Sequence, residues 1–468
     1  MNLSALERRH VNPVPESAGH GTSWRQGPFW FLGNFHPLTV AIAFLGPAVG
    51  LSGLWTSVAG VGGILFGAIF MAAHAPQGPS LGLPQMVQSR AQFGYRGVTV
   101  PLFATTFTFV GFNVIIVVVL KQGLHQILGW GATPVALGAS AAATLLAIYG
   151  HDVIHRIVVA IFWISLPLWL VLTFGVVSGR AHGHGPLVGG FNLAGFFAMF
   201  AVAASYNITY APCVSDYTRY LARDTARRPL VAAVFAGAAG APIWLIPLGA
   251  WMATRLGVTD ALTGIYLSGN ATLPHLGVAL VVVSAAALVA TMSISAYSAM
   301  LSVLTVVDGL RKVRDGARVR VVTVVAIALT WFVVAEVLTN ATTVLNNALL
   351  FMLYLLAPWT SINLVDFYWV RRGRYVVADL TEPGGIYGNV GGRALAAYAL
   401  GLALEVPFVS LNHLYQSPGA TWLAGVDVSW MVGLVVAGAS YWLLARHTDV
   451  EGELRRAARS RVHAVVDA

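Results

Sequence analysis

Residues 29–53 are almost entirely apolar, but two short stretches interrupt them: GNFHP at 33–37 and Gly46-Pro47. A helix needs about 20 apolar residues to cross the hydrocarbon core of a bilayer. Within lipid, backbone that leaves the helix must find partners for its N–H and C=O groups in protein, water or a ligand. The segment therefore predicts a membrane helix that is broken at a binding site.

Residues 191–220 have the same character, because an apolar run is followed by SYNITYAP at 205–212. Gly and Pro are common in membrane helices, so either segment alone is weak evidence. Interrupted helices at matching places in two halves of a chain are typical of transporters that are built from inverted repeats, with the site where the breaks meet. The matched pair therefore predicts such a repeat.

The composition places the whole chain in the membrane. Hydrophobic residues make up 57% of the 468 residues and charged residues only 10%, whereas charged residues make up about 25% of a soluble domain. The expected fold is an all-α integral membrane protein with twelve transmembrane helices. They are predicted at about 28–52, 54–74, 98–127, 131–149, 154–178, 190–213, 229–254, 275–307, 320–338, 342–366, 393–412 and 426–446.

The basic residues give the expected orientation. With these spans, 24 of the 27 Lys and Arg residues lie on the side of the N-terminus, and only Lys121, Arg180 and Arg255 lie on the other side. Lys and Arg are enriched in cytoplasmic loops. We therefore expect a multi-pass protein of the plasma (inner) membrane with both termini cytoplasmic, and no nucleic-acid partner despite the net charge of +9.

Catalytic and metal chemistry is not predicted. No acidic residue lies at the middle of a predicted span, so a carboxylate proton relay is not evident. His151, Asp152 and His155 have metal-like spacing but lack further ligands nearby, and Cys213 is the only cysteine. We expect no enzyme, no catalytic residue and no cofactor, with Na⁺ as the one candidate metal ion.

Polar groups at bilayer depth indicate where a ligand would bind. Span 3 contains Phe112 and Asn113, whose alternative roles are packing and a helix-helix hydrogen bond. Span 8 contains TMSISAYS at 291–298, whose hydroxyls suit a hard cation, although Ser and Thr also join neighbouring helices. His36 lies at the break of span 1, where its ring is expected to face substrate.

Several motifs resemble the nucleobase-cation symporter-1 family, also called the purine-cytosine permeases. They are NPVP at 12–15, FWFLGN at 29–34, GLPQM at 82–86, SRAQFGYRG at 89–97, VSDYTRYL at 214–221 and YSAMLS at 297–302. The resemblance covers about residues 12–445. It implies the leucine-transporter type fold, a 5+5 inverted repeat with discontinuous helices 1 and 6.

The domains that follow from this resemblance are a cytoplasmic segment at 1–27, a transporter domain at 28–446 and a cytoplasmic tail at 447–468. Within the transporter, the first repeat is 28–178, the second is 190–366, and two peripheral helices occupy 393–446. The implied function is import of a planar heterocycle, with cytosine or purines favoured, by symport with H⁺ or Na⁺.

The resemblance also implies a set of site residues. The substrate ring would stack on aromatic side chains of spans 3 and 6, and amides would bind its polar edge. Phe112 matches the stacking position in span 3. Asn207 matches the one in span 6, so Tyr206 or Tyr210 would have to supply the second ring. The implied substrate-binding residues are Asn34, Phe35, His36, Phe112, Asn113, Tyr206, Asn207, Tyr210 and Ser295.

The cation site and the gate are implied in the same way. The positions that match the cation site are Gly33, His36, Ala287, Ala290 and Thr291, and Asp216 with Arg219 would form a cytoplasmic gate. The open alternatives are an amino-acid or amine transporter on the same fold and a vitamin (thiamine-like) permease. A loop ion pair that serves only topology is the alternative for Asp216 and Arg219.

Overall fold

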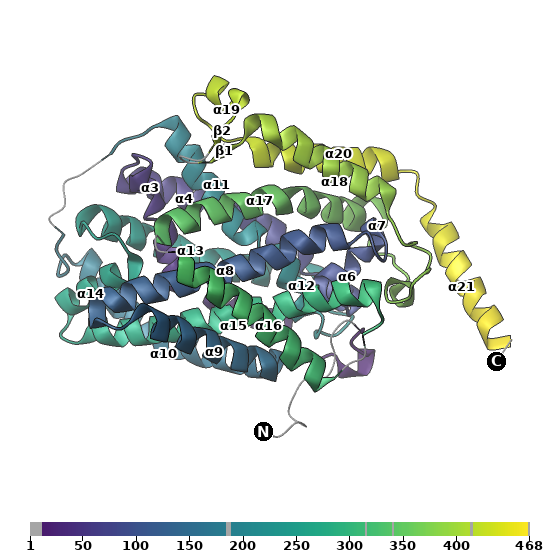
Figure 1. The fold of residues 1–468 in the computed structure, drawn as a ribbon, viewed down its shortest axis with the longest axis horizontal. Coiled ribbons are helices and arrows are strands. Elements are labelled where there is room, and N and C mark those ends of the chain that lie inside the picture. The colour runs from purple at the N-terminus through teal and green to yellow at the C-terminus, as the bar shows by residue number, and fades with distance from the viewer. Residues whose placement is uncertain (1–11, 184–188, 314–315, 339–340, 412–414, 467–468) are drawn as a thin grey trace.

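Long helices that run side by side make up the molecule (Figure 1). The structure is a computed structural model and describes residues 12–183, 189–313, 316–338, 341–411 and 415–466. The long helices are α4 (Gly53–His74), α8 (Thr99–Leu128), α9 (Ala132–Tyr149), α10 (His151–Val177), α11 (Leu193–Ile208), α13 (Arg227–Arg255), α15 (Leu276–Leu310), α16 (Ala317–Val337), α17 (Ala341–Val365), α18 (Gly392–Glu405), α20 (Ser429–Ala445) and α21 (Val450–Val466).

Shorter elements connect these helices. They are η2 (Glu16–Ala18), η3 (Ser23–Arg25), α1 (Gln26–Gly33), α2 (Pro37–Ile42), α3 (Leu45–Ala48), α5 (Gln77–Leu81), α6 (Gln85–Gln88), α7 (Arg90–Phe93), η4 (Ala211–Cys213), α12 (Val214–Thr218), α14 (Ala261–Thr272), η5 (Asp366–Val370), η6 (Val377–Leu380), η7 (Val406–Phe408), β1 (Ser410–Leu411), β2 (Tyr415–Gln416) and α19 (Pro418–Trp422).

The first span is broken where the sequence predicts it. The segments 23–33 and 37–48 meet at an angle of 58°. Pro37 is the first residue of α2, and His36 before it is extended, with φ −158° and ψ 168°. A proline cannot donate a backbone hydrogen bond and disfavours helical backbone in the residue before it, so α1 cannot continue into α2.

The sixth span is interrupted more gently. Helix α11 ends at Ile208, Thr209 and Tyr210 form a turn, and η4 and α12 follow. Unlike the first span, residues 193–218 still pass as one continuous candidate span. Pro212 lies at the start of η4, where its missing N–H is tolerated.

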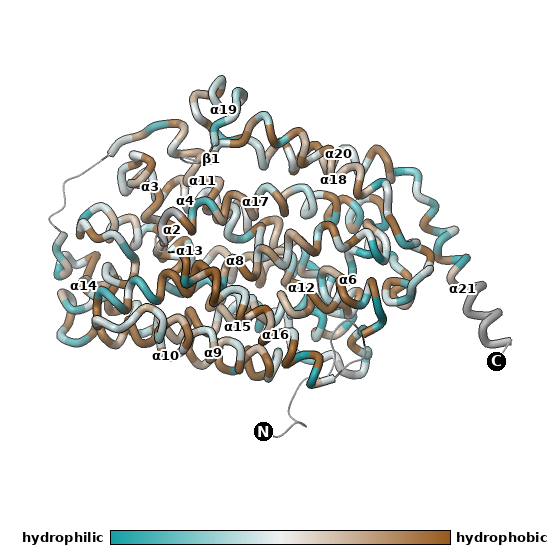
Figure 2. The backbone as a smooth tube through the Cα atoms, in the orientation of Figure 1, coloured by the Kyte–Doolittle hydropathy of each residue, from teal (hydrophilic) through white to brown (hydrophobic). Residues whose placement is uncertain are grey.

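Ten of the twelve predicted spans correspond, within the described residues, to helices that are long and apolar enough to cross a membrane. Within the described residues, nine helices are long and apolar enough to cross a membrane, and the bent pair makes a tenth. Helices α18 and α20 occupy the remaining two predicted spans. Figure 2 shows mostly apolar colouring along the long helices, with hydrophilic segments mainly at their ends and in the loops.

Two details differ from the prediction. The eleventh span was expected at 393–412, but α18 ends at Glu405 because Pro407 follows and a small hairpin of β1 and β2 begins at Ser410. Residues 255–274 were left outside the spans, yet α14 forms there. Asp260 caps α14 by accepting a hydrogen bond from the N–H of Thr263 at 2.9 Å.

Helix α4 packs tightly against α11 and α13 through small residues. A Cβ atom at Gly63 would lie 2.2 Å from the carbonyl oxygen of Phe200, and one at Gly67 would lie 2.3 Å from that of Ala204. Only glycine permits this approach, which is typical of membrane helix contacts. Spans 2 and 6 are therefore held together closely beside the interruption of span 6.

The C-terminal helix α21 extends away from the other helices (Figure 1). It is fastened by ion pairs from Arg371 to Glu453 and from Arg374 to Glu451. Residues 1–11 of the predicted N-terminal segment and residues 467–468 of the predicted tail lie outside the described residues.

Candidate functional site

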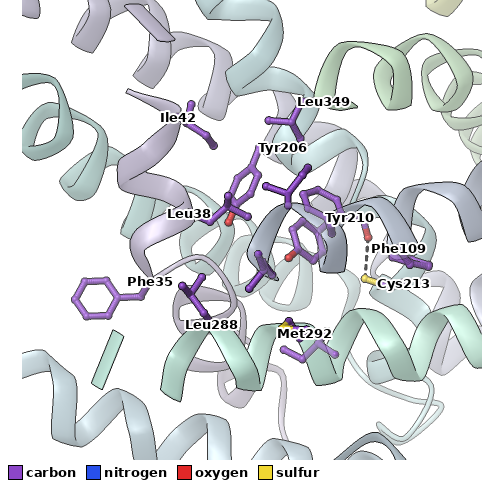
Figure 3. Packing of buried hydrophobic residues seen from close by; sticks show 14 of the residues in the cluster. Phe35, Leu38, Ile42, Phe109, Tyr206, Tyr210, Cys213, Leu288, Met292 and Leu349 are labelled. Atoms are coloured by element: carbon purple, nitrogen blue, oxygen red, sulfur yellow. Dashed lines mark hydrogen bonds between the residues drawn. The ribbon is translucent and has the colours of Figure 1, made fainter. Parts of the chain in front are cut away.

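Three buried rings from spans 3 and 6 lie against one another beside the interruption of span 6. The ring of Phe112 on α8 stacks on that of Tyr210, with centroids 5.1 Å apart and planes 28° apart. Tyr206 meets Phe112 edge to face at 6.1 Å and Tyr210 at 5.7 Å. Tyr206 and Tyr210 come from the same segment, and Figure 3 shows their side chains together. We call these three residues the ring cluster.

Buried polar atoms without partners occur on α8, beside Phe112, and on α15. Within the described part of the chain, both side-chain polar atoms of Asn113 and the hydroxyls of Ser295 and Ser298 make no hydrogen bond. The hydroxyls of Tyr210 and Ser295 are close to each other, but not in hydrogen-bonding geometry. A buried polar group without a partner costs about 1–3 kcal/mol, so these atoms are suited to a ligand with donors and acceptors.

The break of span 1 is held by side chains that replace missing backbone partners. His36 places Nε2 2.9 Å from the carbonyl oxygen of Gly33 and 3.2 Å from the hydroxyl of Tyr206. The Thr39 hydroxyl donates to the carbonyl oxygen of Asn34 at 2.5 Å and lies 3.2 Å from the Tyr206 hydroxyl. Tyr206 therefore connects the break to the ring cluster.

The two predicted amides of spans 1 and 6 bind each other and the neighbouring helices. Asn34 donates to the carbonyl oxygen of Ala238 on α13 at 2.9 Å and to the Oδ1 of Asn207 at 3.4 Å. Asn207 also donates to the carbonyl oxygen of Ile64 on α4 at 3.3 Å. Both side chains thus join spans 1 and 6 to spans 2 and 7 in this structure.

Phe35 lies in a different aromatic group. Its ring centroid is 5.2 Å from that of Phe31, 5.5 Å from that of Trp169 and 5.2 Å from that of Trp244. Figure 3 shows its ring pointing away from Tyr206 and Tyr210. The structure therefore separates Phe35 from the ring cluster, although it places Phe112, Tyr206 and Tyr210 together.

The matched cation positions lie on α15 and at the break. Ala287, Ala290 and Thr291 are buried, and α15 packs against α2. Two of the carbonyl groups already accept hydrogen bonds, because Gly33 receives one from His36 and Ala290 receives one from the Ser293 hydroxyl at 2.6 Å.

The predicted gate residues are both buried. Asp216 accepts a hydrogen bond from the backbone N–H of Gln85 at 3.0 Å, which attaches α12 to α6. Arg219 donates to the hydroxyls of Tyr220 at 2.8 Å and Tyr297 at 3.1 Å. The end of span 6 is thereby joined to span 8.

The sequence analysis did not select Thr39, and it named Tyr297 and Ser298 only as part of the hydroxyl-rich stretch 291–298, not as individual site residues. Thr39 and Ser298 are recognised only from their neighbours in space, because hydroxyls are common in membrane helices. Tyr297 belongs to the motif YSAMLS at 297–302, which the family resemblance already included. That motif is the sequence signal by which Tyr297 could have been selected.

The broken first span, the interrupted sixth span and the buried ring cluster of spans 3 and 6 define a multi-span membrane transporter of the leucine-transporter fold type. Residues 13–433 match the model of a family described as permeases for cytosine/purines, uracil, thiamine and allantoin. The chain belongs to this family, the nucleobase-cation symporter-1 or purine-cytosine permease family. It is therefore a membrane permease and not an enzyme.

Individual relatives cover almost the whole chain. YxlA of Bacillus subtilis (strain 168), which is named as a purine-cytosine permease, is 32% identical over 94% of this chain and 96% of its own length. The purine-cytosine permease fcyB of Emericella nidulans is 24% identical over 94% of this chain and 88% of its own. Mhp1 is a nucleobase-cation-symport-1 family transporter, solved in a closed conformation with bromovinylhydantoin bound. It superposes on this chain with a TM-score of 0.72 at 18% identity, and the match covers 97% of this chain and 96% of Mhp1. This likeness confirms the fold.

Proposed function

We propose that the protein imports a nucleobase or a related planar heterocycle, with cytosine or a purine favoured, together with H⁺ or Na⁺. The observation that carries this proposal is the ring cluster of Phe112, Tyr206 and Tyr210, which is fully buried beside the interruption of span 6. Aromatic faces bind flat π-systems by stacking. The family description and the names of the relatives support the same class of substrate.

The substrate would enter between Phe112 and Tyr210. Their centroids are 5.1 Å apart, whereas a ring placed between two aromatic faces needs about 7 Å, twice the contact distance of carbon atoms. The structure is thus closed at this point, and binding requires α8 and the segment after α11 to separate by about 2 Å. Alternating access provides such a movement.

The polar edge of the heterocycle would satisfy the unpartnered atoms of Asn113, Ser295 and Ser298. A neutral ring with N–H donors and carbonyl or ring-nitrogen acceptors matches an amide and hydroxyls. No carboxylate or ammonium group of the substrate is needed, which favours a heterocycle over an amino acid or an amine.

The end of span 6 would serve as the inner gate. Asp216 holds α12 against α6, and Arg219 holds it against Tyr297 on span 8. Under the expected orientation this side faces the cytoplasm of a plasma (inner) membrane protein. Release of substrate would then require the bonds of Arg219 to Tyr220 and Tyr297 to break.

Uptake of radiolabelled cytosine, hypoxanthine, uracil, allantoin and thiamine into cells that express the full chain tests the proposal. We expect saturable uptake of a planar heterocycle, lost in Phe112→Ala and retained in Phe103→Ala. Phe103 lies on the same helix with 71% of its surface exposed, so it controls for the substitution itself. No uptake of any heterocycle by protein present at the cell surface would contradict the proposal.

A further inference from the structure

A polar pocket of about 300 Å³ lies on the side of the molecule that the expected orientation places in the cytoplasm. Three segments that are distant in the sequence form it: residues 20–26 at the start of span 1, residues 151–156 at the start of α10 and residues 217–221 at the end of span 6. Small-molecule sites have volumes of about 300–1,000 Å³. The pocket therefore has room for one small ligand.

Basic side chains predominate among the residues that line this pocket. They are two arginines and three histidines: Arg25, Arg156, His20, His151 and His155. Among the described lining residues Asp152 is the one acid, and its carboxylate, which accepts a hydrogen bond from Nδ1 of His151 at 2.9 Å, is 75% exposed. A guanidinium group is always charged and binds phosphate through two parallel N–H···O bonds. The lining is therefore suited to a phosphate group.

Aromatic rings form another part of the pocket wall. The ring of His151 lies 4.4 Å from that of Tyr220 and 5.6 Å from that of Tyr217, measured between centroids. The ring of His155 stacks on Phe29, with centroids 5.2 Å apart and planes 3° apart. Aromatic faces bind nucleobases by stacking. A ligand that carries both a base and a phosphate group would match both parts of the lining.

The two tyrosines of the pocket belong to the end of span 6, which we propose as the inner gate. The Tyr220 hydroxyl accepts a hydrogen bond from Arg219 at 2.8 Å and lies 3.3 Å from the Tyr297 hydroxyl. The Tyr217 hydroxyl donates to the carbonyl oxygen of Ile294 on α15 at 3.3 Å. A ligand in the pocket would contact these tyrosines together with the starts of spans 1 and 5. It would therefore stabilise the closed gate.

We propose that this pocket binds a nucleoside monophosphate and that the bound nucleotide holds the inner gate closed. Arg25 and Arg156 bind the phosphate group, and the base stacks on the ring of Tyr220. The inference rests on the proposed function, because it assigns an inhibitor of the same transport cycle. A nucleoside monophosphate is the class of product that forms when an imported base is joined to a ribose phosphate. A ligand that binds only the closed conformation shifts the equilibrium towards it, so this product would slow further import.

Arg228 provides a matched control within the same chain. It is exposed, as Arg25 and Arg156 are, and it lies in the first turn of α13 on the same side of the membrane under the expected topology. It is not among the residues that line the pocket. Arg228→Gln therefore removes the same charge without touching the proposed site.

Binding is measured first, by isothermal titration calorimetry of the purified full chain with cytidine monophosphate and inosine monophosphate. We expect binding by the wild-type protein and by Arg228→Gln. Arg25→Gln and Arg156→Gln should each bind about tenfold more weakly, because the loss of one charge-assisted hydrogen bond corresponds to about that factor. Cytidine lacks the phosphate group and inorganic phosphate lacks the base, so each should bind more weakly than the nucleotide.

Transport is measured next, as counterflow of radiolabelled cytosine or hypoxanthine in proteoliposomes with the nucleotide on both sides of the membrane. At its dissociation constant the nucleotide occupies half of the protein, so exchange by the wild type and by Arg228→Gln should fall by about half. The variant that combines Arg25→Gln and Arg156→Gln should exchange at the same rate with and without that concentration. Exchange without nucleotide shows that each variant is folded.

The outcomes separate this inference from the proposed function. Absence of nucleotide binding, or binding that Arg25→Gln and Arg156→Gln leave unchanged, would overturn the inference, while counterflow would still support the proposed function. Inorganic phosphate that binds as tightly as the nucleotide, or phosphatidylglycerol vesicles that displace it, would overturn the nucleotide assignment. Nucleotide binding that leaves counterflow unchanged would overturn the role at the gate. Nucleotide binding without counterflow of any heterocycle would support the pocket and contradict the proposed function.

Discussion

The interruptions of spans 1 and 6 are matched in the sequence but differ in structure. Span 1 bends by 58°, and its freed carbonyl groups at Gly33 and Asn34 are bound by side chains from α2 and its cap. Span 6 has no bend above 40° at its interruption, and the Thr209 hydroxyl donates to the carbonyl oxygen of Ser205 within the same segment at 2.7 Å. The first break therefore forms a polar network, whereas the second presents aromatic rings. Each supplies a different part of the site.

The largest expected effect concerns the rings of span 6. Tyr210→Ala should weaken the apparent affinity for the heterocycle about tenfold to 100-fold, because stacking of a base on an aromatic ring contributes about 1–3 kcal/mol. Tyr210→Phe keeps the ring and should lose much less. Competition of unlabelled heterocycle against uptake measures both affinities. Equal affinities for Tyr210→Ala and the wild type would show that the stacked pair does not hold substrate.

The next effect concerns the amides that join the two breaks. Asn34→Ala removes the hydrogen bonds to Ala238 and Asn207 and should lower the free energy of unfolding by about 1–2 kcal/mol. Asn207→Ala should behave similarly, and the double variant should lose less than the sum. Thermal unfolding in detergent measures this, with Ser57→Ala as the control, since Ser57 bonds within its own helix. Strict additivity would mean that the two amides act independently.

A smaller difference in stability is expected between variants of Thr39 and Thr209. Thr39→Val breaks bonds to Asn34 and Tyr206 and should destabilise the protein by about 1 kcal/mol. Thr209→Val breaks bonds only within its own segment, and we expect less than about 0.5 kcal/mol. The same thermal measurement compares them. A larger loss for Thr209→Val would reverse our view that span 1 needs the stronger support.

The smallest difference in stability is expected between variants of Pro37 and Pro212. Pro37→Ala should destabilise the protein by about 0.4–1 kcal/mol, mainly because the unfolded chain gains conformational freedom. Pro212→Ala should change stability by a similar amount, since each proline lies in the first turn of its helix. Denaturant midpoints measure the difference. A much larger loss for Pro37→Ala would show that the proline also stabilises the bend in the folded protein, in addition to the bonds of His36 and Thr39.

Much of the fold was predictable because its signals are local. Long apolar windows located ten of the spans closely, and GNFHP at 33–37 located the bend. The end of α18 was misplaced because the apolar run continues past Pro407, which ends the helix. Helix α14 was not predicted because it is short and only moderately apolar. Its cap at Asp260 and its packing against α15 stabilise it.

The site was predicted less completely. The sequence selected Phe112, Tyr206 and Tyr210 as candidate site residues. It did not show that their rings contact one another. It gave equal weight to Phe35, which the structure places among Phe31 and Trp244, because the direction of a side chain beyond a break depends on the bend angle. The motif match pointed to Asn207, and only the structure shows that its side chain accepts a hydrogen bond from Asn34.

The sequence alone determined that the chain crosses the membrane many times and where its first span breaks, because hydrocarbon excludes polar backbone and proline excludes helix. The tertiary structure decided which groups meet across the breaks. The contacts of His36 with Gly33 and Tyr206, and of Phe112 with Tyr210, depend on the packing of distant spans. No local pattern encodes these contacts, since they arise only when the helices assemble.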